Sequence, residues 1–130
     1  MQEPAMTAAI ARTLSALDLL SRHPAGLSVQ SVAVQLGIAP SATHRLLNDL
    51  LRARYVRQDS QTGNNALTIR LAAMGLSWLG RTGILDVTQP VLDKLAETSG
   101  ELVRLSVADG NRLIWVAFVQ GAKTGLRSDP

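Results

Sequence analysis

The sequence predicts a mainly α-helical protein with short β-hairpins, made of a small N-terminal domain, a linker helix and a partial α/β domain. Apolar residues recur at helical spacing in five segments, which predicts the helices. Turn-forming residues at 60–65 and at 109–110 each separate two short apolar runs, which predicts the hairpins. We place the boundaries at residues 1–68, 69–85 and 86–130.

Composition argues against an enzyme. The chain of 130 residues has no cysteine and two histidines, which leaves no thiol nucleophile and too few imidazoles for an all-histidine metal site. It shows no Ser/His/Asp set, no paired carboxylates in an apolar pocket and no phosphate-binding glycine loop. We therefore expect no catalytic residue, metal or cofactor.

Hydropathy and charge indicate where the protein acts. No apolar run approaches the roughly 18 residues that span a bilayer, and residues 1–6 lack the features of a signal peptide, so we expect a cytoplasmic protein without a membrane partner. Residues 1–81 carry eight Lys and Arg against four Asp and Glu, whereas residues 82–130 carry five against six. A basic first part favours a nucleic-acid partner, although many other domains are also mildly basic.

Three helices are predicted before residue 54. The first spans 7–22, with Thr7 as its N-cap and its apolar side formed by Ile10, Leu14, Leu17 and Leu20. The second begins after a Ser28 cap and ends at Gly37. The third runs from Pro40 to about Ala53, and its inner side is Thr43, Leu46, Leu47 and Leu50. Two short helices joined by a glycine turn form a helix-turn-helix.

The outer side of the third helix carries the candidate site. Its polar residues are Ser41, His44, Arg45 and Asn48. In a major groove, arginine reads guanine and asparagine reads adenine, so this side suits base recognition. A solvated surface is the alternative, in which Arg45 pairs with Asp49 one turn later. Ser28 could bring the backbone amides of the second helix to a DNA phosphate. Arg57 either contacts the DNA backbone or is a surface charge that keeps the protein in solution, and the same two alternatives hold for Arg52 and Arg54.

The rest of the chain predicts a wing, a linker and a second hairpin. The wing has strands at 55–59 and 66–68, and the linker helix runs from Ile69 to about Arg81. A further helix begins at Asp86, with Gln89 completing a capping box, and carries Val87, Val91 and Leu95 at helical spacing. The last hairpin turns at Asp109-Gly110, and we expect one apolar side to combine Val103, Leu105 and Val107 with Ile114, Val116 and Phe118. Trp78 and Trp115 are expected in a core or an interface.

The run LDLLSRHPAGLSVQSVAVQLGIAPSATHRLLNDLLRARYVRQD resembles the DNA-binding domain of the IclR family of transcriptional regulators. The motif residues are the Gly-Leu-Ser turn, the Leu-Gly break and Ser41, His44, Arg45, Leu46 and Leu47. The similarity continues into QPVLDKLAETSGELVRLSVADGNRLIWVAFVQG, which resembles the start of the family's effector domain. The resemblance implies a winged helix-turn-helix, a linker helix and a partial effector domain.

This chain departs from the family pattern at the DNA-facing surface. Pro40 and Ala42 stand where a basic residue and a hydroxyl are usual, and 64–66 read Asn-Asn-Ala where two arginines and an aromatic residue are usual. Fewer cations predict weaker DNA binding than in a typical member. We also expect the sensing domain to be incomplete after Pro130, so a small organic acid effector is expected only of a longer chain.

The sequence therefore leaves two functions open. The first is recognition of operator DNA by a homodimer, because one helix-turn-helix reaches only one half-site. The second is a winged-helix module that binds a protein partner or forms a heterodimer, with weakened DNA binding.

Overall fold

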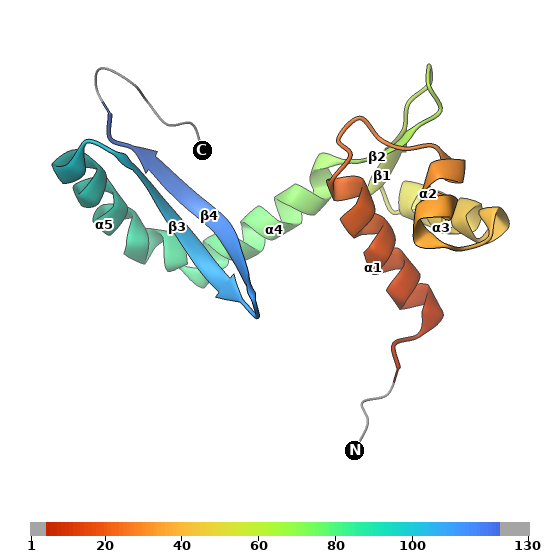
Figure 1. Cartoon of the computed structure of the whole chain (residues 1–130), viewed down its shortest axis with the longest axis horizontal. Helices are drawn as coiled ribbons and strands as arrows, with labels where there is room; N and C mark the ends of the chain where they lie inside the picture. The colour runs from red at the N-terminus through yellow and green to blue at the C-terminus, as the bar shows by residue number, and fades with distance from the viewer. Residues whose placement is uncertain (1–4, 123–130) are drawn as a thin grey trace. The chain divides into compact units, whose positions relative to one another are not determined.

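The computed structural model describes residues 5–122 (Figure 1). The chain divides between Gly75 and Leu76 into two compact units. Residues 5–122 include no helix that is both long enough and apolar enough to cross a membrane. The mainly α-helical class with two small antiparallel hairpins, predicted from the sequence, is confirmed.

The first unit has three helices followed by a hairpin. The helices are α1 (Ala8–Ser21), α2 (Val29–Leu36) and α3 (Pro40–Arg52). The strands β1 (Val56–Gln58) and β2 (Asn65–Leu67) pair antiparallel, and α4 (Ile69–Thr82) follows them. This order is that of a winged helix-turn-helix, in which the hairpin is the wing.

The core of this unit lies where α1, α2 and α3 meet. Leu20, Val32 and Leu47 contribute one fully buried side chain from each helix. On α1 the predicted inner side was partly wrong, because Ile10 and Leu14 are each 54% exposed. Only the C-terminal half of α1 buries residues, and these are Ala16, Leu19 and Leu20.

Local signals fix the ends of α2 and α3. The Ser28 hydroxyl accepts a hydrogen bond from the Ser31 N–H at 3.1 Å, and Gly37 ends α2 with a φ of 67°, as predicted. Pro40 opens α3. Thr7 stands at the N-cap of α1, but its side chain makes no capping hydrogen bond.

The second strand of the wing begins one residue earlier than predicted. Asn65, expected in the turn, is the first residue of β2 and is 4% exposed. Its N–H donates to the Leu27 carbonyl at 2.7 Å, and its carbonyl accepts from the Leu27 N–H at 2.9 Å. Asn65 therefore joins the loop between α1 and α2 to the wing.

The second unit has one helix against one hairpin. The helix α5 (Ile84–Ser99) packs on both β3 (Leu102–Asp109) and β4 (Arg112–Gln120). It starts two residues before the predicted Asp86, at a Gly83 cap, and the expected capping box is absent because the Gln89 amide donates to Asp93 instead. Leu92 and Ala96 are buried, and the exposed residues are Val87, Val91 and Leu95.

A β-bulge changes the register of the second hairpin. The turn residues are Gly110 and Asn111, because Asp109 pairs with Arg112. Leu105 pairs with Ala117 and Ser106 with Trp115, which leaves Val116 as the extra residue of β4. An extra residue reverses the alternation beyond it, so Ile114 and Phe118 lie on opposite faces and the expected single apolar side is wrong.

Candidate nucleic-acid interface

The exposed side of α3 carries all four residues that the sequence singled out there. Ser41, His44, Arg45 and Asn48 are exposed, whereas Thr43, Leu47 and Leu50 on the opposite side are buried in the core. The core therefore fixes which side of α3 faces outward. A partner that meets α3 would contact a hydroxyl, an imidazole, a guanidinium and an amide on a single helix.

Arg45 is available to a partner. The ion pair found between residues of the described range 5–122 joins Arg22 to Asp18 at 3.4 Å, and Arg45 and Asp49 are not paired. The alternative in which Arg45 is held by Asp49 is therefore wrong for this structure. The guanidinium keeps its donors for an acceptor outside the protein.

At the start of α2, Ser28 acts as a cap. Its hydroxyl accepts from the Ser31 N–H and donates to the Ser31 hydroxyl at 3.1 Å, so it is occupied within the helix. A phosphate at this end would instead meet the N–H groups of Val29 and Gln30, which precede the capped Ser31 in the first turn.

The wing carries one exposed cation, Arg57 on β1, between Val56 and the turn. The turn is held by Asp59, whose carboxylate accepts from the Gln61 N–H at 2.7 Å and the Thr62 N–H at 3.0 Å. The N–H donors of Thr62 and Gln61 hold the pKa of Asp59 below its ordinary value of 3.8. The carboxylate is therefore charged at neutral pH, when it orders the tip of the wing.

Aromatic contacts connect the wing to the start of α4. The Arg70 guanidinium lies 5.4 Å from the ring centre of Tyr55, and the Tyr55 hydroxyl lies 3.7 Å from the Met74 sulfur. The Thr68 hydroxyl donates to the Arg54 carbonyl at 2.5 Å. Arg54, which has a left-handed φ of 67°, turns the chain from α3 into the wing.

Residues 9–60, which include α1, α2, α3 and β1, match the family model of the IclR helix-turn-helix domain. The first unit therefore carries a helix-turn-helix domain of the IclR type. It is 33% identical over 100 residues to the acetate operon repressor of Salmonella typhimurium and 31% identical over 100 residues to the transcriptional repressor IclR of Escherichia coli. Each alignment covers 77% of this chain and 36% of the relative.

The family likeness extends to the solved structures. An IclR family transcriptional regulator from Brucella abortus superposes with a TM-score of 0.81 and 26% identity, over 98% of this chain and 49% of that chain. The likeness therefore includes the second unit. This chain spans about a third of the length of the two named repressors of the IclR family and about half of the Brucella protein. The repressors and the Brucella protein are named as regulators of transcription and not as enzymes.

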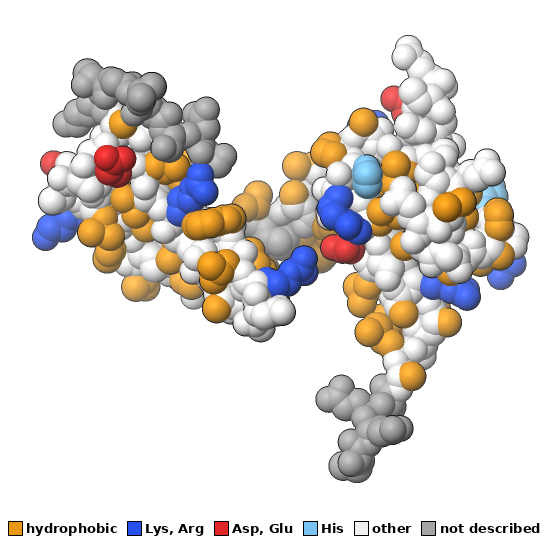
Figure 2. Space-filling model, in the orientation of Figure 1, with side chains coloured by type: hydrophobic (Ala, Val, Ile, Leu, Met, Phe, Trp, Pro, Cys, Tyr) orange, Lys and Arg blue, Asp and Glu red, His pale blue; other side chains and the backbone are white. Residues whose placement is uncertain are grey.

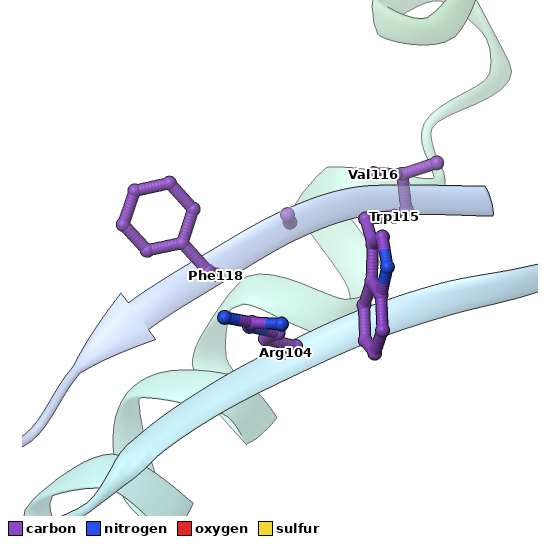
Figure 3. A pocket seen from close by; sticks show the side chains of 5 residues that line it. Arg104, Trp115, Val116 and Phe118 are labelled. Atoms are coloured by element: carbon purple, nitrogen blue, oxygen red, sulfur yellow. The ribbon is translucent and has the colours of Figure 1, made fainter. Parts of the chain in front are cut away.

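A second exposed surface lies on the hairpin of the second unit. Arg104 of β3 lies between Trp115 and Phe118 of β4, with its guanidinium 5.0 Å from the Trp115 ring centre (Figure 3). These side chains line an open depression of about 440 Å³. Trp115 is 59% exposed and Trp78 on α4 is 68% exposed, so neither lies in a core, and the alternative of an interface position stays a prediction.

Proposed function

We propose that the first unit binds duplex DNA with α3 in the major groove, and that the protein regulates transcription through this binding. The observation that carries the proposal is the exposed side of α3, where Ser41, His44, Arg45 and Asn48 stand opposite the core. An α-helix fits the major groove, and these side chains supply the donors and acceptors that distinguish base pairs there. With DNA as its partner, the protein acts in the cytoplasm.

Each contact has a distinct role. Arg45 donates two hydrogen bonds to a guanine and Asn48 pairs with an adenine, while Ser41 and His44 contact the same groove. The amides after Ser28 and the guanidinium of Arg57 bind the phosphate backbone, which positions α3 without reading sequence.

A salt-titrated gel shift tests this function, with one duplex selected from a random library and one unselected duplex. Arg45→Ala should lose about 1 to 3 kcal/mol of affinity on the selected duplex and relax the base preference at one position of the half-site. Arg57→Ala should weaken both duplexes alike and reduce the salt slope by about one unit.

Two outcomes would count against the function. Equal losses on both duplexes for Arg45→Ala would show that this arginine does not read a base. A wild-type chain that binds neither duplex at low salt would favour the second function, in which the winged helix binds a protein partner.

We propose further that the DNA-bound form is a homodimer. Hydrophobic side chains are exposed along α1, which Figure 2 shows as a stripe that leads toward the N-terminus. Met6, Ile10 and Leu14 are more than half exposed, and on α4 the exposed apolar residues are Ile69, Met74, Leu76 and Trp78. Apolar stripes of this kind on two helices suit a second copy of the chain, and two copies would place two α3 helices on two half-sites.

Leu14→Glu should reduce dimerisation, because it places a carboxylate in the apolar stripe of α1. Ser15→Glu is the matched control, since Ser15 is exposed on the same helix outside that stripe. Analytical ultracentrifugation should find a dimer for the wild type and the control, and a monomer with weak DNA binding for Leu14→Glu. A wild type that sediments as a monomer at roughly tens of micromolar would contradict the proposal.

A further inference from the structure

A cleft of about 410 Å³ separates α1 from α3 in the first unit. Alanines line both walls, with Ala8 and Ala9 on α1 and Ala42 on α3. Arg12 enters the lining from α1, and Arg45 enters it from α3. Because the alanine side chains are small, the space between the helices stays open, and the guanidinium groups of Arg12 and Arg45 border it.

The charges of this cleft favour an anion. Asp49 is its one acidic lining residue, against two arginines, and no ion pair joins it to either of them. The comparison with Arg22, the C-cap residue of α1, is informative because Arg22 is paired with Asp18 at 3.4 Å. Arg12 is exposed and has no such carboxylate partner among residues 5–122. Arg12 therefore offers its donors to a group outside the protein.

The position of the cleft specifies which anion it meets. Arg45 belongs both to the exposed side of α3 and to the lining of the cleft, so the cleft is continuous with the proposed base-reading surface. The phosphate strands of a duplex border both sides of the major groove. When α3 lies in that groove, the strand on the α1 side runs past the mouth of the cleft.

We propose that Arg12 binds a backbone phosphate of the DNA strand that borders the α1 side of α3, with the α1–α3 cleft as the phosphate site. This inference rests on the proposed DNA binding and adds a contact on a helix outside the helix-turn-helix. A single guanidinium on a phosphate supplies affinity and orientation without sequence preference. Together with Arg57 on the wing, it would fix α3 from two separate elements.

The test is a salt titration of DNA binding by the full chain, on the selected and the random duplex. Arg12→Ala should weaken both duplexes by the same factor and reduce the slope of log affinity against log salt by about 0.9. Arg12→Lys should keep the wild-type slope, because it retains the charge. Arg22→Ala, at the C-cap of α1, is the matched control and should keep both affinity and slope. Thermal melting by circular dichroism should show that all variants fold.

The outcomes separate this inference from the proposed function. If Arg12→Ala keeps wild-type affinity and slope while Arg45→Ala weakens the selected duplex, the phosphate site is wrong and the DNA function stands. A loss for Arg12→Ala on the selected duplex alone would also overturn it, because a phosphate contact cannot discriminate sequence. If the wild type shows no salt-dependent binding to either duplex, the proposed function itself fails.

Discussion

Gly26 occupies a position that no other residue fits. It is buried, its φ is 87°, and a Cβ atom there would lie 2.6 Å from the Asn65 carbonyl oxygen. The clash would push apart the loop after α1 and the wing, and a left-handed φ adds strain for any side chain. A glycine is thus needed at position 26 for Leu27 to pair with Asn65.

Gly26→Ala should destabilise the first unit by about 2 to 4 kcal/mol, the combined cost of overpacking and of the left-handed backbone. Gly37→Ala is the matched control, because Gly37 has a φ of 67° but no atom within 4 Å of the added Cβ. It should cost only about 1 kcal/mol. Urea unfolding of the two variants measures both values. Equal losses would show that the backbone strain alone, and not the contact with Asn65, accounts for the effect.

The residues that the sequence predicted are those with local signals. Ser28 is recognisable as a cap from the helix that follows it, and the polar side of α3 follows from its own apolar spacing. Asn65 and Arg12 were missed because their roles depend on contacts with distant segments. The side chain of Asn65 lies 3.5 Å from the Leu27 carbonyl oxygen across 38 positions. No pattern within one helix or strand could show such a contact.

At the scale of elements, the wing is the part that differs most from the family pattern, and a single substitution can test the difference. At the tip, the Asn64 N–H donates to the Thr62 hydroxyl and its carbonyl accepts from the Asp59 N–H, so the backbone holds the turn. The side chain is half-buried and replaceable.

Asn64→Arg should strengthen binding to any duplex and increase the salt slope by about 0.9, because it adds one phosphate contact to the wing. Asn64→Gln, which enlarges the side chain without charge, is the control and should leave the slope unchanged. Fluorescence anisotropy at several salt concentrations measures both. An unchanged slope for Asn64→Arg would mean that the wing does not approach the DNA backbone.

The helices show where periodicity fails as a guide to burial. On α1 and α5 the sequence offers apolar residues on more than one side, for example Leu14 and Leu20 on α1 and Val91 and Leu92 on α5. The structure buries Leu20 on α1 and Leu92 on α5. Spacing identifies a helix and its apolar stripes, but the neighbouring elements decide which stripe is covered.

At the scale of the whole molecule, the two units differ in how much they bury. The first unit encloses a core from three helices and the wing, whereas α5 contributes only Leu92 and Ala96 as buried residues of the second unit. Over residues 76–122, the sheet of the second unit has two strands, so β3 and β4 each have an edge without a strand partner.

The fold class and the order of elements were predictable because each element has a local pattern. The register of β4 was not, because the bulge at Val116 leaves no mark in the alternation.

Hydrogen exchange should reflect this difference. Amides of β3 and β4 should exchange faster than those of α2 and α3, because a two-stranded sheet under one helix has little buried area to oppose local opening. Mass spectrometry of peptides from 102–120 and from 29–52 would measure the two rates. Equal protection of both segments in a demonstrated monomer would contradict this explanation.

The short pairing between Leu27 and Asn65 has a mechanical consequence. Two backbone hydrogen bonds fasten the base of the wing one residue before the Ser28 cap, so the start of α2 and the wing strands must shift together on any surface that they touch. Only the turn at residues 59–64, which lies beyond these hydrogen bonds, can gain or lose residues without moving the start of α2. Evolution or design could thus retune the reach of the wing tip while the spacing between α2 and the wing stays constant.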